Sequence, residues 1–304
     1  MKLSTHQAWS LVTKTFGSWL SDYAPSMGAA LAFYTLFSVA PLLMIVIAVA
    51  GYFFGADAAR GEIYDQLAGL MGRNGAHAIE GLIASANNAS RRSFFAGIGI
   101  VVFLIGATSV FTELQNSLNR IWRVQRTAHT AHFFALVRTR LLSFGMILAI
   151  AFLLMVSLLV SAALSTLGKW WGPASAEWAL IAQVLNVVLS FALIAVLFAM
   201  IYKIIPQITV HWEDVWIGAA TTSMLFTLGK QLIGIYLGRS GTVSAFGALG
   251  SLAVFLLWVY YSAQIFLLGA EFTHIYSGVR THQRTTQEPP SPALANARPL
   301  AKSR

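Results

Sequence analysis

Polar residues inside the long apolar stretches of this chain are the residues whose types and spacing could carry chemistry. Tyr260, Gln264 and Glu271 are separated successively by four and seven positions, which places them along one stripe of a helix. Lys230 is the one base that falls within an apolar stretch. In hydrocarbon such groups are energetically expensive, and they usually mark a path for a substrate, an ion or a proton.

The elements that must position these residues are apolar runs long enough to cross a bilayer. Hydrophobic residues make up 57% of the 304 positions and charged residues 10%, below the roughly 25% charge of a soluble domain. A helix needs about twenty apolar residues to cross roughly 30 Å of hydrocarbon. We therefore predict an all-α membrane bundle of about six transmembrane helices, near residues 29–54, 94–111, 141–163, 179–202, 215–237 and 246–270.

The basic residues predict the orientation of this bundle. With both termini in the cytoplasm, thirteen of the twenty lysines and arginines fall on the inner side, six fall on the outer side, and Lys230 lies within a span. The positive-inside rule therefore favours an N-in/C-in topology. We expect the lipid bilayer as partner, with anionic headgroups at the cytoplasmic face. The formal charge of +9 is divided among the loops, so it does not indicate nucleic-acid binding.

Two segments lie outside the predicted spans. The external loop 56–92 carries hydrophobic residues at helical spacing, among them Ile63 and Ile79, so it is predicted to be amphipathic and to lie along the outer interface. Residues 279–304 are polar, basic and rich in proline, which predicts a disordered cytoplasmic tail after a membrane domain at 1–278.

Depth along the predicted spans groups several polar side chains. Most of them fall in the inner half of the membrane, whereas Asn186 and Lys230 lie nearer the outer side. The residues of this candidate polar pathway are Thr35, Ser38, Glu113, Asn116, Asn186, Thr221, Thr222, Lys230, Tyr260, Gln264 and Glu271. Two interpretations stay open, a shared polar layer or scattered interhelical hydrogen bonds, each worth about 1 kcal/mol or less.

Two of these residues have specific alternatives. Glu271 lies close enough to the cytoplasmic end of the last span to be simply solvated. Lys230 lies about 10 Å below the outer end of its span and could extend its amine outward to phosphate headgroups.

Proline and glycine positions predict local features of the helices. Pro41 lies near the middle of the first span and cannot donate a backbone hydrogen bond, so we expect a kink or a helix break there. The break would line a cavity, and the alternative is an ordinary packing kink. Gly51 with Gly55, and Gly234 with Gly238, have the small-xxx-small spacing that permits close helix contact.

No cofactor, metal or catalytic site is predicted, and we expect no enzymatic activity. The chain has no cysteine, which excludes a disulfide framework and thiolate chemistry. The pair His129 and His132, and the group His211, Glu213 and Asp214, resemble fragments of metal sites. A hydrolytic zinc site needs three converging ligands, and solvated loops explain these groups better.

Three blocks of sequence carry a resemblance to a known family. They are ALAFYTLFSVAPLL at 30–43, GATSVFTELQNSLNRIW at 106–122 and GSLAVFLLWVYYSAQIFLLGAEFTHIY at 250–276. These blocks resemble the YihY/BrkB family of bacterial inner-membrane proteins, and the resemblance extends over roughly residues 10–278. The family was once labelled ribonuclease BN, a label now regarded as a misannotation.

The resemblance implies a location in the bacterial inner membrane but supplies no catalytic residue. Transport or translocation of a small or lipid-like envelope substrate is the leading hypothesis. A non-catalytic membrane scaffold or envelope-assembly factor is the alternative, and a ribonuclease ranks last because no acid/base cluster supports it. Assembly into a homo-oligomer is left open.

Overall fold

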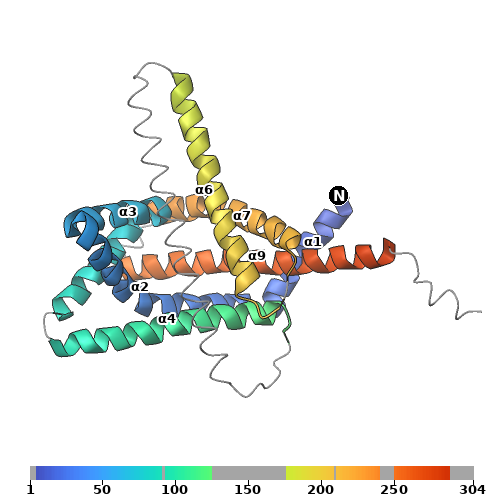
Figure 1. The fold of residues 1–304 in the computed structure, drawn as a ribbon. Helices are drawn as coiled ribbons and strands as arrows, with labels where there is room; N and C mark the ends of the chain where they lie inside the picture. The colour runs from blue at the N-terminus through green and yellow to red at the C-terminus, as the bar shows by residue number, and fades with distance from the viewer. Residues whose placement is uncertain (1–4, 91–92, 125–175, 209, 240–249, 288–304) are drawn as a thin grey trace, which may run out of the picture.

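The computed structural model describes residues 5–90, 93–124, 176–208, 210–239 and 250–287, and every regular element in these ranges is an α-helix. This confirms the predicted all-α membrane bundle (Figure 1). The helices are α1 (Thr5–Ser21), α2 (Ala24–Phe54), α3 (Ala56–Ser90), α4 (Ser93–Ile121), α6 (Ala176–Ile204), α7 (Trp212–Arg239) and α9 (Gly250–Gln287).

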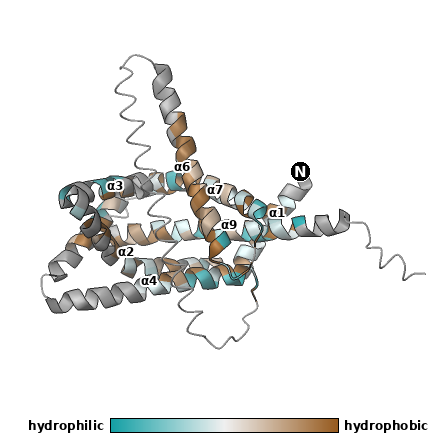
Figure 2. Cartoon of the chain, in the orientation of Figure 1, coloured by the Kyte–Doolittle hydropathy of each residue, from teal (hydrophilic) through white to brown (hydrophobic). Residues whose placement is uncertain are grey.

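Long apolar segments occur in three of the described helices. Ala24–Met44 of α2, Val187–Ile204 of α6 and Leu252–Arg280 of α9 are long and apolar enough to cross a membrane. Figure 2 shows such apolar stretches most clearly along α6. The predicted spans at 94–111 and 215–237 fall within α4 and α7, whereas the predicted span at 141–163 lies outside the described residues. The number of spans and the N-in/C-in topology stay predictions.

Helix α9 lies at the centre of the bundle. It contacts α1, α2, α3, α4 and α7, and Figure 1 shows α6 crossing the bundle and leaning away from it. The largest core cluster of the described residues lies between α2, α4, α6, α7 and α9, and it includes the fully buried side chains of Leu118, Tyr202, Val215 and Leu267. This arrangement places the polar stripe of α9 inside the bundle.

The last helix extends beyond the predicted start of the tail. Helix α9 continues to Gln287, so residues 279–287 are helical and not disordered. Two physical reasons account for the extension: Arg280 is tied to α7 by ion pairs, and the first proline after the span is Pro289. Residues 288–304 lie outside the described residues.

Helix α2 includes the proline at which a break was predicted. The helix runs from Ala24 to Phe54 and contains Pro41 without an interruption. Membrane helices tolerate proline because neighbouring groups can satisfy the freed backbone carbonyl. A kink or break at Pro41 stays a prediction.

Close contacts between helices depend on glycines that face hydroxyl-bearing side chains. Where α7 crosses α9, Gly218 packs against Thr273 and Gly269 packs against Thr222. A Cβ atom added to Gly218 would lie 2.7 Å from the Cβ of Thr273, a separation that real side chains do not adopt. The absence of a Cβ at Gly218 therefore sets the spacing between the two helices.

The predicted glycine pairs are not these contacts. Gly55 and Gly234 have no atom within 4 Å of an added Cβ among the described residues. Spacing alone misses the contacts because a glycine permits close approach only where a neighbouring helix is present.

Helix α3 folds back on itself. The hydroxyl of Tyr64 lies 3.0 Å from Nε2 of His77, although thirteen residues of straight helix would separate them by about 20 Å. Figure 1 shows the resulting reversal beside the ends of α2 and α7. The second arm carries Ile79, which is 1% exposed and packs against Phe255 of α9. The predicted external loop is thus a helical hairpin anchored in the bundle.

Helix α1 presents an exposed apolar stripe. Trp9, Val12, Phe16 and Leu20 are all more than half exposed, and their spacing places them on one face of the helix. Leu11 is buried and lies on the opposite side. A stripe of this kind is typical of a helix that lies in the membrane interface.

A nitroxide probe can test this orientation of α1, because the chain has no native cysteine. We expect a probe at Val12→Cys to collide more with oxygen, and a probe at Lys14→Cys to collide more with a water-soluble nickel complex. Lys14 is the matched control because it is exposed and lies two positions away, about 200° around the helix. Greater access of the nickel complex at both positions would exclude the interfacial arrangement.

Candidate functional site at the charged end of the bundle

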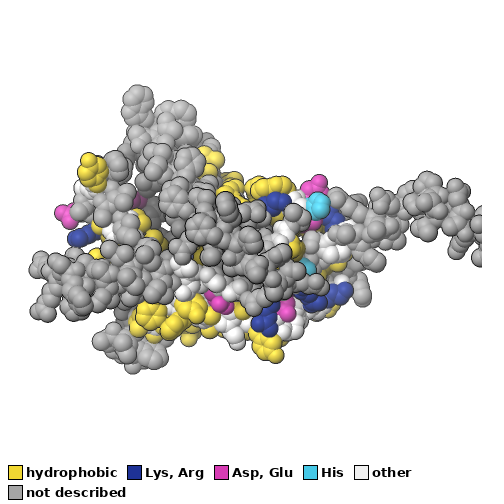
Figure 3. Space-filling view, turned by 60° about the horizontal axis from the view of Figure 1, so that its bottom comes forward, with side chains coloured by type: hydrophobic (Ala, Val, Ile, Leu, Met, Phe, Trp, Pro, Cys, Tyr) yellow, Lys and Arg dark blue, Asp and Glu magenta, His cyan; other side chains and the backbone are white. Residues whose placement is uncertain are grey.

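Charged side chains from three segments meet at one end of the bundle. We call this the charged end: it contains Asp22 between α1 and α2, Arg123 just after α4, and Glu271 and His274 on α9. Asp22 and Arg123 lie close enough to interact electrostatically with both α9 residues. Figure 3 shows charged and histidine side chains gathered toward the end from which α9 projects.

Two left-handed backbone positions build the corners of this site. Tyr23 has φ 59° and Arg123 has φ 50°, in a region that non-glycine residues seldom adopt. At the end of α4, the N–H of Arg123 donates to the carbonyl of Arg120 at 3.0 Å, and the N–H of Val124 donates to that of Asn119 at 2.9 Å. This is a Schellman motif with arginine in the position that glycine usually occupies. The chain therefore accepts backbone strain, of about 1 kcal/mol or more, where Arg123 joins the cluster.

Glu271 is the most unusual residue of the site. Its side chain has 0% exposure, and apart from the close approach of the Asp22 side chain, neither carboxyl oxygen has a hydrogen-bond partner among the described residues. Burial of an ionised carboxylate without partners is strongly unfavourable. The alternative of a simply solvated Glu271 is therefore incompatible with the structure.

His274 lies one helical turn from Glu271 and faces Trp122. The two rings are 5.1 Å apart at an interplanar angle of 75°. Nδ1 of His274 and Nε1 of Trp122 are both buried without a hydrogen-bond partner in the described structure. Three neighbouring side chains thus have polar atoms with unused hydrogen-bonding capacity.

The polar stripe of α9 also contacts the start of α2, deeper in the bundle than Glu271. Nε2 of Gln264 lies 3.5 Å from the carbonyl oxygens of Ala24 and Pro25, and Gly28 leaves room for the amide. Oε1 of Gln264 is buried without a partner among the described residues. Gln264 and Glu271 therefore both face the start of α2, as their shared stripe predicts.

A second polar group joins α6, α7 and α9 within the core. The hydroxyl of Tyr202 donates to the carbonyl of Phe266 at 2.7 Å and lies 3.1 Å from Oγ1 of Thr222. Thr222 in turn donates to the carbonyl of Gly218 at 2.8 Å. Sequence reasoning singled out Thr222 but missed Tyr202, which hydropathy had placed at the end of a span.

The other hydroxyls of the candidate pathway bond within their own helices. Thr35 donates to Leu31 at 2.7 Å, Ser38 donates to Thr35 at 3.2 Å, and Thr221 donates to Ile217 at 2.9 Å. Ser38 also packs against Gly106 of α4. These residues do not join the charged end, so the structure divides the candidates instead of placing them in one layer.

The remaining candidates lie apart from these groups. Lys230 is half-buried on α7 and forms no ion pair with the part of the chain that the structure describes. Glu113 and Tyr260 are half-buried, Asn116 is exposed, and the side chain of Asn186 is outside the described structure.

An ion-pair group lies beyond the cluster on α9. Nη1 of Arg280 bonds Oδ1 of Asp214 at 3.0 Å, and Nη2 contacts Glu213. Asp214 is buried, whereas Glu213 is exposed. These carboxylates had resembled part of a metal site beside His211. The described residues contain no group of three metal ligands, and His129 and His132 lie outside them.

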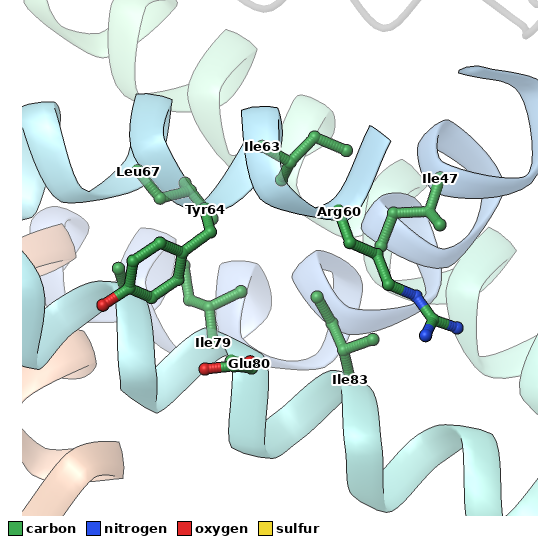
Figure 4. Close-up of a pocket in the computed structure, with 9 residues that line it drawn as sticks. Ile47, Arg60, Ile63, Tyr64, Leu67, Ile79, Glu80 and Ile83 are labelled. Atoms are coloured by element: carbon green, nitrogen blue, oxygen red, sulfur yellow. The ribbon is translucent and has the colours of Figure 1, made fainter. Parts of the chain in front are cut away.

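A small open pocket of about 70 Å³ lies at the opposite end, between α2 and the α3 hairpin (Figure 4). Most of the side chains that line it are aliphatic, and Arg60, Tyr64 and Glu80 complete the lining. His77 links Tyr64 to Glu80, which lies 3.2 Å from Nδ1 of the imidazole. The pocket is far along the bundle from Glu271 and is therefore a separate feature.

Comparison with known proteins identifies the family. The model of the family described as virulence factor BrkB matches residues 15–294, which is most of the chain. The chain belongs to the BrkB family. This confirms the resemblance that the three sequence blocks carry.

Several curated relatives of this BrkB-family chain are described as UPF0761 membrane proteins. The one from Halorhodospira halophila is 28% identical over 271 residues, which is 87% of this chain and 58% of the relative. The one from Ralstonia nicotianae is 31% identical over 257 residues, covering 82% of this chain and 54% of the relative. The chain therefore spans little more than half of these two relatives. No solved structure matches it.

Proposed function

We propose that this BrkB-family membrane protein moves a small or lipid-like envelope substrate across the bacterial inner membrane. The observation that supports the proposal best is the fully buried Glu271 beside Asp22, Arg123 and His274. Ionisable residues in this setting are typical of substrate, ion or proton pathways in membrane bundles.

The physical reason is that the cluster does little for stability. An apolar side chain at position 271 would pack in the same space without several kilocalories per mole of desolvation. A residue that is unfavourable for folding is more readily explained by a role in translocation. Gln264 on the same stripe extends the polar surface deeper along α9.

A membrane scaffold is the second candidate, supported by the exposed apolar stripe of α1. In that case the protein binds a partner along α1 and moves no substrate. Replacement of Glu271 would then have little effect, whereas polar substitutions at Phe16 and Leu20 would abolish the function.

Reconstitution into phospholipid vesicles separates the two candidates. The probes are a fluorescent phosphatidylethanolamine, bleached from outside by dithionite, and entrapped radiolabelled amino acids. For a transporter we expect one probe to move faster than in protein-free vesicles. Glu271→Gln should lower that rate about tenfold or more, which corresponds to a barrier change of about 1.4 kcal/mol.

Asp65→Asn is the matched control, because Asp65 is an exposed acid on α3 far from the charged end. This variant should move the probe at the parent rate. If the parent protein and protein-free vesicles give equal rates for every probe, translocation of these substrate classes is refuted.

A further inference from the structure

The charges around Glu271 do not balance when this residue is ionised. Asp22 and Glu271 would then contribute two negative charges, and Arg123 contributes one positive charge. One added proton makes the group neutral without any other change. Because Glu271 itself is fully buried, where charge is poorly solvated, this balance favours the state with one bound proton.

The other ionisable groups around the site are occupied elsewhere. Arg280 of α9 pairs with Asp214 and Glu213 of α7, and Lys203 of α6 donates to the carbonyl of Val210. Arg120 of α4 lies over the ring of Tyr23, 5.1 Å from its centroid. The remaining basic residue of α1, Lys14, is exposed on that helix. None of these groups forms an ion pair with Glu271 in the described structure.

The site also has a route to water. Arg123 is exposed and Asp22 is half-buried, so the cluster opens to the surface on the side of the α1–α2 corner. His274 follows Glu271 by one turn and carries an unpartnered, buried Nδ1 that can accept or donate a proton. A proton can therefore pass between water and the buried carboxylate by way of neighbouring polar atoms.

We propose that Glu271 is a proton-binding site, loaded and unloaded from the charged end through Asp22 and His274. The step is simple: Glu271 carboxylate gains one proton from the aqueous phase and becomes a neutral carboxylic acid, and release reverses it. Resting on the proposed function, the inference identifies a proton as the coupling ion of translocation. The proton neutralises Glu271 for the part of the cycle in which it is buried.

Infrared spectroscopy of the full chain in vesicles tests the site without knowledge of the substrate. We expect difference spectra between acidic and alkaline pH to contain the carbonyl stretch of a buried carboxylic acid, sensitive to deuterium exchange. Glu271→Gln should remove this band and Asp65→Asn should retain it. If the band is absent from the parent, or is unchanged in Glu271→Gln, the proton site is refuted.

Two further variants keep the test decisive if Glu271→Gln does not fold. Asp22→Asn removes a repelling negative charge, so the band should disappear at a lower pH than in the parent. Arg123→Gln removes an attracting positive charge, so the band should disappear at a higher pH. Identical titration of the band in both variants would refute the assignment.

The two proposals fail in different ways. If the Glu271 band titrates as expected and no probe moves, the proton site stands and the proposed translocation is refuted for those probes. If a probe moves and Glu271→Gln keeps the band, translocation stands and the proton site is refuted.

Discussion

Gly218→Ala is expected to destabilise the bundle by about 2–3 kcal/mol, within the range measured when extra atoms are forced into a packed core. The new methyl group would overlap the side chain of Thr273, with 2.7 Å to its Cβ and 2.8 Å to its Cγ2. Thr273 is β-branched and fully buried, so it cannot rotate away. Helices α7 and α9 would have to separate. Heating in detergent, with size-exclusion chromatography to quantify the protein that remains folded at each temperature, measures the loss of stability.

Gly234→Ala is the control for this prediction, because it lies on the same helix and an added Cβ meets no described atom within 4 Å. It should be neutral or slightly stabilising, since alanine favours helix. Adding Thr273→Gly to Gly218→Ala should recover part of the loss by returning the space. Equal stability of Gly218→Ala and Gly234→Ala would mean that α7 and α9 do not approach as closely as described.

Arg280→Glu is expected to lower Tm further than any conservative change at this position. It would put a third carboxylate beside Asp214 and Glu213, and Asp214 is buried, so solvent could not screen the repulsion well. Arg280→Lys keeps the charge but loses the bidentate contact with Asp214 and Glu213, so its Tm should fall between those of Arg280→Glu and the parent. The same chromatographic measurement gives the order.

Salt provides the control for the Arg280 series. The partner that matters most is buried, so high salt should reduce the difference between Arg280→Lys and the parent only slightly. The double variant Arg280→Glu with Asp214→Arg should regain part of the lost stability by reversing the pair. If Arg280→Glu unfolds at the same temperature as the parent, the described pairing does not hold α7 to α9.

Hydropathy predicted α2, α6, α7 and α9 because long apolar runs have few alternatives in hydrocarbon. Hydropathy could not predict the reversal in α3, because both arms have the same helical spacing of apolar residues and this spacing does not locate a bend between them. The extension of α9 was also missed. It depends on Arg280 contacting Asp214, sixty-six positions earlier, and no local pattern contains that contact.

The candidate site was predicted in part. The spacing of Gln264 and Glu271 placed both on one stripe, and the same stripe could have identified His274, three positions beyond Glu271. Asp22 and Arg123 follow helix ends, where sequence gives no indication of which helix lies alongside. The full burial of Glu271 arises from contacts with these distant segments, so depth alone left a solvated Glu271 open as an alternative.

The length of α9 has a mechanical consequence. Its 38 residues make a rod of about 57 Å, whereas hydrocarbon is about 30 Å thick. One unjointed helix, with no proline, therefore carries both the buried Glu271 and a segment that must stand in water. A protein that binds the projecting turns and rotates them about the helix axis would rotate Glu271 by the same angle. Binding on the aqueous side could therefore change the position of the buried acid through α9 alone.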